Sequence, residues 1–305
     1  MLISSVDPTL YTRRAACGQS IKAADAATIE LWVTPTSSNQ GGPARIFESQ
    51  DAAVEAILAG EVQAGVEVDN PSDPRFGFTR TRQRVFAAGD AHSPAALEAL
   101  RAWLVEETFP RMKAEGYGVT GVYFSHPAWG ERIGMMGLPG RVAAMQRQHY
   151  LFQVEDNLPQ AALPEGFELR IADRVLLDEP GLLDMQDLRD EMCSERASVE
   201  EFLQKSFGIV ALHGNTLAGW CLSEYNCGLR CEVGIGTQEP FRRRGLAAAM
   251  GAAFLQEARR RGIRQVGWDC FADNTPSAAT ALRLGFGKVA DYTACLVWFS
   301  ALHST

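Results

Sequence analysis

The residues best suited to chemistry lie in one stretch of the sequence, EVGIGTQEPFRRRGLA, from Glu232 to Ala247. Apolar residues recur at helical spacing from Leu246 onward, so Gly245 stands at the expected start of a helix. Three cationic side chains directly precede it, namely Arg242, Arg243 and Arg244. The first amides of a helix have no partner within the helix and can bind an anion, and guanidinium groups beside them favour a diphosphate. A turn that merely needs a glycine at this position would give the same local pattern.

A strand with an acidic residue and alternate glycines leads into this turn. We expect the strand over Cys231 to Thr237, with Glu232 near its start. Gly234 and Gly236 lack side chains, so a flat ligand could lie against the strand backbone. A partly buried carboxylate with a raised pKa can draw a proton from an amine, directly or through water, and Glu232 is the first candidate for that role. An exposed strand carboxylate without a catalytic role is the alternative.

The second half of the chain is typical of a mixed α/β unit that would position this stretch. The helix that starts at Leu246 stops at Gly262, after arginines that favour a helix C-terminus. The other expected strands are Phe167 to Ile171, Phe207 to Leu212, Ala218 to Ser223, Val266 to Cys270 and Val289 to Phe299, and the other expected helices are Pro180 to Cys193, Val199 to Lys205 and Thr275 to Gly285. The pattern predicts an antiparallel meander that feeds a strand, helix, strand crossover.

The first half shows the same order of elements, which favours a degenerate repeat of one fold. Pro159 and Pro164 flank a short break, so we expect an N-terminal α/β domain over residues 1–158 and a second domain over residues 159–305. Ser93 before Pro94 is typical of a helix N-cap and stands where the second half has its arginine-rich turn. The expected strands are Ala44 to Phe47, Val62 to Val68, Phe76 to Ala87, Val119 to Phe124 and Gln146 to Gln153, and the expected helices are Gln50 to Ala59, Pro94 to Lys113 and Trp129 to Met135.

In this context the second half resembles the GNAT superfamily of N-acetyltransferases. Their phosphate-binding pattern, Arg or Gln, two residues, Gly, one residue, Gly or Ala, is met by Arg242, Gly245 and Ala247. Over about residues 165–300 the chain is also similar to the smaller zwittermicin-resistance-type GNAT acetyltransferase family. Besides the EVGIGT strand and the RRRGLA turn, the residues that carry this likeness are Trp220, Cys221, Ser223, Glu224, Trp268, Asp269, Cys270, Asn274, Ser277, Ala281, Leu284, Gly285, Phe286 and Tyr292.

The resemblance implies acetyl-CoA as the donor and a fold whose central strands splay to admit the thioester. It places the diphosphate on amides of the RRRGLA turn and the pantetheine along the preceding strand, with two contacts on the far side of the cleft. The implied cofactor-binding residues are Val233, Gly234, Ile235, Gly236, Arg242, Arg243, Arg244, Gly245, Leu246, Ala247, Asn274 and Ser277. The first half, which lacks such a turn, is then a GNAT-like domain that binds no coenzyme A and helps to shape the acceptor pocket.

The resemblance leaves one catalytic position open. Many members of the superfamily have a tyrosine seven residues after the asparagine, as the acid for the departing thiolate, but Ala281 stands there in this chain. Tyr292 is expected to replace it, with Ser277 or water as alternatives and a plain core tyrosine as the other interpretation of Tyr292. Cys270 could form an acetyl-cysteine intermediate, but direct transfer in a ternary complex is the superfamily norm, so we expect direct attack.

Composition excludes several other classes. The net charge is −8 and each half holds more acidic than basic residues, which disfavours nucleic-acid binding. No stretch approaches the length of a membrane span and the start of the chain does not resemble a signal peptide, so we expect a cytoplasmic protein that does not bind membranes. Cys227, Cys231 and His213 do not have the spacing of zinc ligands, and no metal is expected.

The sequence therefore predicts an acyl-CoA-dependent N-acyltransferase that acetylates a primary amine of a small molecule. The alternatives are an acyl-CoA-binding regulatory or scaffold protein with little turnover, and an enzyme that acetylates lysines or N-terminal amines of proteins. An acidic run on the helices before the meander, from Asp184 to Glu201, could attract a cationic amine or could simply be a solvated helix face.

Overall fold

The computed structural model describes residues 52–62, 64–70, 73–155 and 157–299, and the expected strand at Ala44 to Phe47 lies outside these ranges. The chain divides into two compact units, both mixed α/β as expected. The second unit runs from Arg147 to Asp291, and the first comprises the chain before it together with the strand that follows from Tyr292. None of the helices in the described ranges is long and apolar enough to cross a membrane.

The first unit is built on the strand order β1-β2-β3-β4-β11. The antiparallel pairs β1–β2 and β2–β3 are followed by the parallel pair β3–β4 and by the antiparallel pair β4–β11. Its elements are α1 (Ala52–Leu58), β1 (Val66–Val68), β2 (Phe76–Arg80), β3 (Arg84–Gly89), α2 (Pro94–Ala102), the π-helix η3 (Trp103–Thr108), α3 (Phe109–Ala114), β4 (Val119–Phe124), α4 (Ala128–Ile133), the first part of β5 (Arg141–Gln153) and the last part of β11 (Gly287–Trp298).

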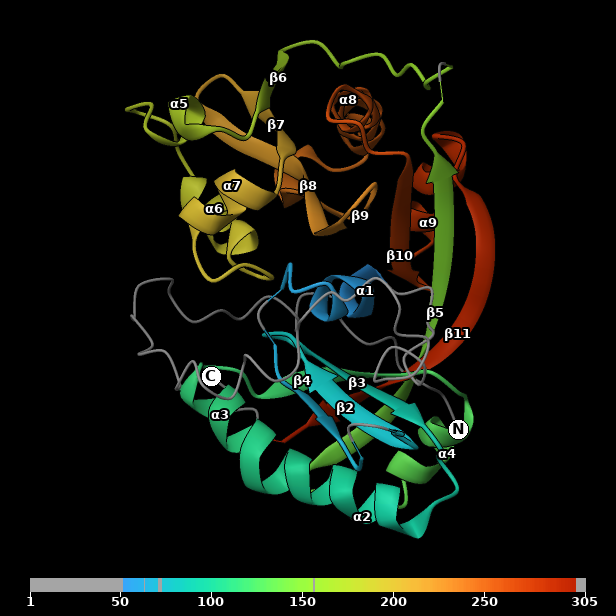
Figure 1. Cartoon of the computed structure of the whole chain (residues 1–305). Coiled ribbons are helices and arrows are strands. Elements are labelled where there is room, and N and C mark those ends of the chain that lie inside the picture. Colours follow the sequence, from blue (N-terminus) through green and yellow to red (C-terminus); the bar gives the residue numbers. More distant parts are fainter. Residues whose placement is uncertain (1–51, 63, 71–72, 156, 300–305) are drawn as a thin grey trace. The chain divides into compact units, whose positions relative to one another are not determined.

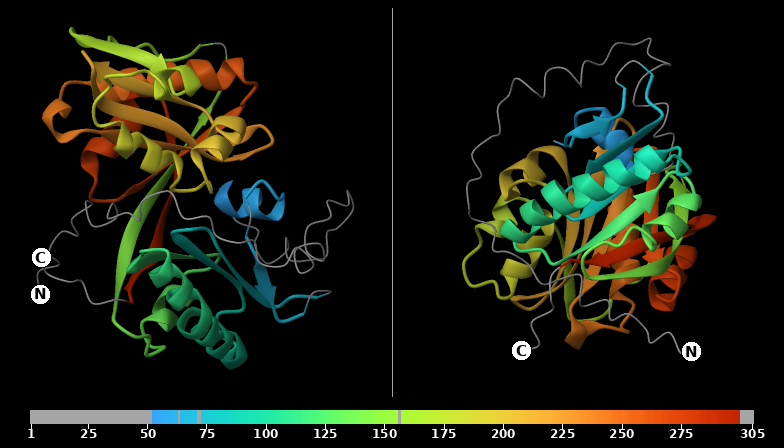
Figure 2. Two further views of the ribbon diagram at one scale, coloured as in Figure 1. Left: turned by 90° about the vertical axis from the view of Figure 1, so that its left-hand side faces the viewer. Right: turned by 90° about the horizontal axis from the view of Figure 1, so that it is seen from below.

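A continuous helical segment, α2–η3–α3, connects the parallel strands β3 and β4 and packs on the sheet of the first unit (Figure 2). Its start is capped as expected, because the Ser93 side chain accepts a hydrogen bond from the backbone N–H of Ala96. The π-helical turn ends directly before the Phe109-Pro110 pair. Proline cannot donate the usual hydrogen bond and its ring crowds the preceding turn, which accounts for a local change of helical register there.

The second unit holds the strand order β5-β10-β9-β8-β7-β6 (Figure 1). All its neighbouring strands pair antiparallel except β9 and β10, which are parallel and joined by the crossover helix α8. Its elements are the second part of β5, β6 (Phe167–Ile171), α5 (Arg174–Leu177), α6 (Met185–Met192), α7 (Val199–Lys205), β7 (Gly208–His213), β8 (Thr216–Cys227), β9 (Arg230–Thr237), the 3-10 helix η4 (Glu239–Phe241), α8 (Leu246–Arg260), β10 (Gln265–Phe271) and α9 (Thr275–Arg283).

Alternating side chains of this sheet build a separate core on each face. On one face, residues such as Cys231, Val266 and Trp268 pack with α8 and α9. On the other face, residues such as Val210 and Leu222 pack with α5, α6 and α7. The two helix groups therefore lie on opposite faces of the sheet.

The two sequence halves exchange their last strands, which the sequence did not reveal. Strand β5 follows α4 in the first half but pairs with β10, and β11 follows α9 in the second half but pairs with β4. The compact units consequently differ from the expected division at residue 158: the chain from Arg147 lies in the second unit and the chain from Tyr292 returns to the first. Apart from this exchange, the succession of pairs matches in the two units, with an antiparallel pair, a parallel crossover and an antiparallel closing strand.

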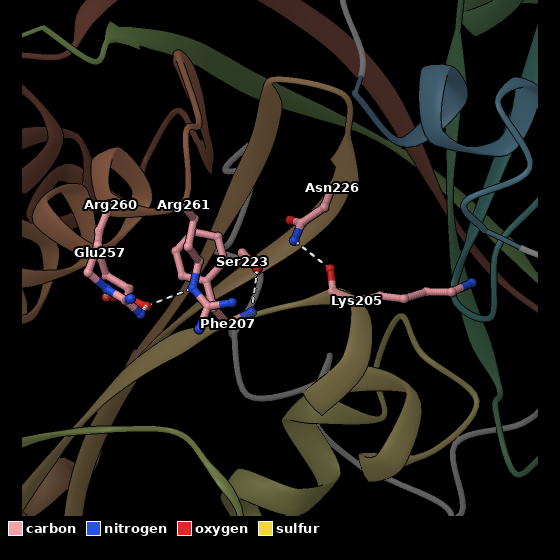
Figure 3. A network of polar contacts seen from close by, with 7 residues as sticks. All are labelled: Lys205, Phe207, Ser223, Asn226, Glu257, Arg260 and Arg261. Carbon is pink, nitrogen blue, oxygen red and sulfur yellow. Dashed lines mark hydrogen bonds and ion pairs between the residues drawn. The ribbon is translucent and has the colours of Figure 1, made fainter.

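A polar network ties the end of α8 to the strands beneath it (Figure 3). The nearly buried carboxylate of Glu257 accepts hydrogen bonds from Arg260 and Arg261, and the Arg261 guanidinium lies 5.0 Å from the ring centroid of Phe207. The backbone N–H of Phe207 donates to Ser223 Oγ at 2.9 Å. The hydrogen bonds from Arg260 and Arg261 hold the pKa of Glu257 below its ordinary value of 4.5 against the opposing effect of burial.

We predict that Glu257→Gln lowers the free energy of unfolding by about 1–3 kcal/mol at neutral pH, because it removes charge-assisted hydrogen bonds from a buried carboxylate. Since folding lowers the pKa of Glu257, this stability is present above pH 4.5 and is lost as the pH falls through the lowered pKa. Urea unfolding at a series of pH values should show the variant and the unmodified protein converge in acid. Glu165→Gln, at an exposed carboxylate, is the control; an equal effect of both substitutions at every pH would contradict the prediction.

Candidate active site

Strands β9 and β10 diverge in the middle of the second unit (Figure 1). Their parallel ladder has three residue pairs and ends at Glu232 and Gly267. Beyond that point β9 continues to Thr237 and stays paired with β8, while β10 continues to Phe271 and stays paired with β5. The edge of β9 from Val233 to Thr237 that faces β10 therefore has no strand partner among the described residues. The splay expected of the two central strands is present, and it leaves backbone groups for an extended ligand to pair with.

The start of α8 lies beside this opening and presents free amides. Arg243 and Gly245 adopt left-handed backbone conformations with φ of 61° and 81°, and the helix has no side-chain cap. In the described chain, the backbone N–H groups from Arg243 to Ala248 make no hydrogen bond. The amides of Phe241 and Arg242 differ from the expectation, because they donate to Gln238 and Glu239 within the loop. This helix start can bind an anion, whereas at the start of α2 the Ser93 side chain already accepts a hydrogen bond from the backbone N–H of Ala96.

The three arginines of the turn have different surroundings. Arg242 donates from Nε to the carbonyl oxygen of Thr237 at 3.1 Å, so it closes the loop that follows β9. The Arg244 guanidinium lies 5.9 Å from the ring centroid of Phe241, and Arg243 is exposed. Arg243 and Arg244 are thus the cations nearest in sequence to the free amides, whereas Arg242 shapes the backbone.

The glycines of β9 make room for side chains of the neighbouring strand, and not for a flat ligand as the sequence suggested. A Cβ atom on Gly234 would lie 2.1 Å from Oε1 of Glu224, and one on Gly236 would lie 2.6 Å from the ring of Trp220. Both side chains come from β8, which is the neighbouring strand. The face of β9 is therefore filled by these side chains and is not open to a flat ligand, and only the strand edge that faces β10 remains for one.

Glu232 lies at the last rung of the ladder between β9 and β10. Its side chain is nearly buried, with 5% of the residue exposed, and its carboxylate lies over Gly267, where a Cβ atom would be 2.5 Å from Oε1. Gly267 therefore makes the space that the carboxylate occupies. Glu224 lies directly opposite Glu232 in the β8–β9 register, so two carboxylates share one face of the sheet at the mouth of the splay.

Two further ionisable residues join Glu232, and sequence reasoning missed one of them. His149 of β5 lies opposite Asp269 of β10, and its Nδ1 is 2.7 Å from Asp269 Oδ2. One ligand atom from each of His149, Glu232 and Asp269 lies within 4.8 Å of the others, a grouping that could also hold a metal ion. His149 is not detectable from local sequence because it reaches this site only through the exchanged strand β5.

On the opposite face, the start of α9 holds the two residues expected to contact the cofactor. The Asn274 side chain caps α9 by accepting from the backbone N–H of Ser277, so Asn274, and not Thr275, is the N-cap. Ser277 Oγ accepts from Trp268 Nε1 at 3.0 Å. Cys270 is buried, and burial raises the pKa of its thiol. Each of these side chains has a structural partner or a packed position.

The tyrosines near the site have different placements. Ala281 of α9 is fully buried and packs in the core with residues of α8, so no side-chain hydroxyl is present at the position of the superfamily tyrosine. Tyr292 belongs to the first unit, where its ring centroid lies 6.5 Å from that of Tyr123. Tyr150 of β5, which the sequence analysis did not single out, lies on the α8 and α9 face and donates its hydroxyl hydrogen to Gln148 Oε1 at 2.7 Å. Burial raises the pKa of Tyr150.

Two other groups from the sequence analysis are not brought together into a site. The acidic residues of α6 and α7 form local pairs, such as Glu201 with Lys205 and Asp187 with Gln238 Nε2. Cys231 is buried in the core and His213 is exposed beside Phe167 and Phe241. Within the described part of the chain, Cys227, Cys231 and His213 do not belong to any group of side chains close enough to share a metal ion.

A family model described as GNAT acetyltransferase matches residues 44–295, which is most of the chain. The chain belongs to this family. Because the match spans both sequence halves, the likeness extends well before residue 165. Membership makes the chain an acetyltransferase enzyme of the acyl-CoA-dependent type.

Individual relatives agree with this assignment to the GNAT acetyltransferases. The chain is 25% identical over 241 residues to the uncharacterized N-acetyltransferase YdfB of Bacillus subtilis, covering 79% of this chain and 88% of that protein. Its fold is similar to that of a GCN5-related N-acetyltransferase-like protein from Streptococcus suis, with a TM-score of 0.61, 22% identity and coverage of 84% and 96%. It is also similar to a tandem GNAT protein from the clavulanic acid biosynthesis pathway, with a TM-score of 0.50, 14% identity and coverage of 82% and 88%.

We predict that Gly267→Ala destabilises this GNAT protein by about 1–3 kcal/mol, because the added methyl group overlaps the Glu232 carboxylate. The loss should be at least about 1 kcal/mol smaller when Glu232 is also changed to Ala, since the overlap then disappears. Urea unfolding of the four proteins of this double-mutant cycle measures the coupling. Gly65→Ala, at a position with open space around it, is the control, and a purely additive cycle at Gly267 and Glu232 would contradict the geometry.

Proposed function

We propose that the protein transfers the acetyl group of acetyl-CoA to a primary amine of a small molecule, by direct attack in a ternary complex. The observation that carries the proposal is the unpaired edge of β9 beside the free amides of α8, which together match an extended pantetheine that ends in a diphosphate. The edge of β9 supplies backbone donors and acceptors for the pantetheine, and the start of α8 supplies donors for the diphosphate. Membership of the GNAT acetyltransferase family supports acyl-CoA as the donor class.

In this proposal the diphosphate binds the amides from Arg243 to Ala247, with Arg243 and Arg244 adding charge. The pantetheine pairs with the edge from Val233 to Gly236, and a backbone N–H near Ile235 polarises the thioester carbonyl. Arg242 contributes by holding the loop against Thr237. Asn274 and Ser277 fix the start of α9 through their hydrogen bonds. The side-chain amide of Asn274 and the hydroxyl hydrogen of Ser277 remain to contact the cofactor.

The acceptor side supports a cationic amine. Glu224 and Glu232 lie opposite each other on adjacent strands, so two carboxylates share one face of the sheet at the mouth of the splay. Negative charge there favours the approach of a cationic amine. Attack requires the neutral amine, so Glu232 would take the proton, directly or through water. The small exposed fraction of Glu232 favours a small primary amine over a bulky acceptor.

Direct attack is favoured over an acetyl-cysteine intermediate. The nucleophilic form of cysteine is the thiolate, and burial raises the pKa of Cys270, which disfavours that form near neutral pH. The acid for the departing coenzyme A thiolate stays a prediction. We retain Tyr292, whose side chain lies in the first unit beside Tyr123, and add Tyr150, whose hydroxyl lies on the α8 and α9 face.

Ala281 favours one second candidate, an acyl-CoA-binding protein with little turnover, because alanine has no hydroxyl to protonate the departing thiolate at that position. The two candidates share the cofactor site and differ in chemistry. Release of free coenzyme A thiol from acetyl-CoA across a panel of primary amines separates them, since a binding protein releases none.

We predict that acetyl-CoA raises the melting temperature of the protein, and that Arg244→Glu together with Gly245→Glu abolishes this shift. The two carboxylates would face the free amides and repel the diphosphate. The matched control is Arg259→Glu with Gly262→Glu, which makes the same changes at the other end of α8, where Gly262 has the same φ of 81°. The control should keep the shift. Equal shifts in both variants would overturn the assignment of the anion site.

We predict separately that Glu232→Gln lowers kcat for amine acetylation by about 100-fold or more, because it removes the proton acceptor, while acetyl-CoA binding is unchanged. Thiol release measured at saturating amine gives kcat, and the acetyl-CoA thermal shift of the same variant reports binding. Glu224→Gln is the matched comparison and should lose less activity. Full activity of Glu232→Gln would exclude it as the base.

A further inference from the structure

His149 holds the most unusual polar atom of the site described above. Only 6% of the residue is exposed, its Nδ1 is 2.7 Å from Asp269 Oδ2, and its Nε2 is buried without a hydrogen-bond partner. An unsatisfied buried ring nitrogen is costly, because it has lost its bond to water without replacement. A carboxylate bonded to one ring nitrogen fixes the tautomer and leaves the other nitrogen with a lone pair. This is the arrangement of a base held ready to accept a proton.

We propose that the His149–Asp269 pair is a proton relay for the acetyl-transfer reaction, acting through Glu232, with His149 as a positioning residue of the active site. The inference rests on the proposed function. The three side chains come from three adjacent strands, β5, β9 and β10, and meet where the ladder between β9 and β10 ends. Polar atoms of this group lie within 4.8 Å of one another, a spacing that a single bridging water can span.

Charged side chains on three neighbouring strands lie near His149. Asp269 of β10 and Glu232 of β9 place two carboxylates beside the imidazole. Arg147 lies two residues away on β5, with its guanidinium 4.8 Å from the ring centroid of Phe271. Asp291 of β11 pairs with Lys288 and accepts a hydrogen bond from Gln148, which points to the opposite face of β5.

The relay completes the balance of protons in the reaction. The acceptor reaches the site as an ammonium ion and gives one proton to Glu232, which passes it through a bridging water to the His149 imidazole; the resulting imidazolium is paired with Asp269. The neutral nitrogen then forms the C–N bond with the thioester carbonyl carbon, and the C–S bond breaks. The nitrogen of the new amide loses its remaining extra proton to the vacated Glu232. One of the two protons held by the cluster then goes to the coenzyme A thiolate, which leaves as the free thiol, and the other is released to solvent. Two protons thus leave the nitrogen, and the cluster holds two acceptors for them.

His149→Asn is the variant that tests the relay, because an asparagine amide can take the place of Nδ1–H against Asp269 but cannot accept a proton. We expect kcat to fall about 10- to 100-fold, with acetyl-CoA binding unchanged. The pH profile of kcat/KM should change in this variant, because the asparagine amide cannot accept a proton in place of the imidazole. His149→Gln should change the profile in the same way, and His92→Asn, at an exposed histidine of the first unit, is the matched control.

Several outcomes decide the matter. An unchanged pH profile and kcat in His149→Asn would overturn the relay while leaving the acetyltransferase proposal intact. Loss of wild-type turnover on treatment with a chelator, restored by Zn²⁺, would also overturn it, because the three side chains would then bind a metal ion. If no amine gives turnover, nitrogen NMR of the ring still decides: a proton retained on Nδ1 and a titrating Nε2 support the relay, and an Nε2 that does not titrate contradicts it.

Discussion

The structure depends on the early end of one β-ladder. After three pairs, β9 and β10 separate, although each keeps its other neighbour. Unpaired backbone groups in the middle of a sheet are expensive unless something bonds to them, so the splay itself requires a ligand or water. An extended chain with amide groups, such as pantetheine, can form these missing hydrogen bonds. The free amides at the start of α8 likewise need an acceptor, and an anion can supply it.

The acceptor side is organised by the same strands. Glycines at positions 234, 236 and 267 exist because side chains from the neighbouring strands, namely Glu224, Trp220 and Glu232, lie over them. The face of the sheet that holds Glu224 and Glu232 is therefore densely occupied, and the edge of β9 remains for the proposed ligand. His149 enters this face from β5, a strand that the first half of the sequence supplies. Exchange of the closing strands thus makes the first half part of the site as well as part of the fold.

Much of this could be predicted from sequence, and the failures have physical reasons. The helix from Leu246, the strand Val119–Phe124 and the cap at Ser93 are local features, set by periodicity, β-branched residues and side-chain hydrogen bonds, and they were confirmed. The superfamily assignment and the splay followed from the RRRGLA turn in its context. Strand partners are not local: nothing near Arg147 or Tyr292 indicates that each strand completes the sheet of the other unit. The prediction that Gly234 and Gly236 leave space for a flat ligand was also wrong. The space beside them is filled by side chains of β8, and the sequence near the glycines does not indicate which strand lies next to them.

The central claim is that the edge of β9 and the start of α8 together receive the donor. Amide hydrogen exchange, followed by mass spectrometry with and without acetyl-CoA, tests it most directly. The account predicts strong protection on binding in peptides that cover Val233 to Thr237 and Arg243 to Ala248. It predicts none at the start of α2, where the Ser93 side chain already accepts from the N–H of Ala96. Binding of acetyl-CoA with no added protection in both of the first two segments would contradict it.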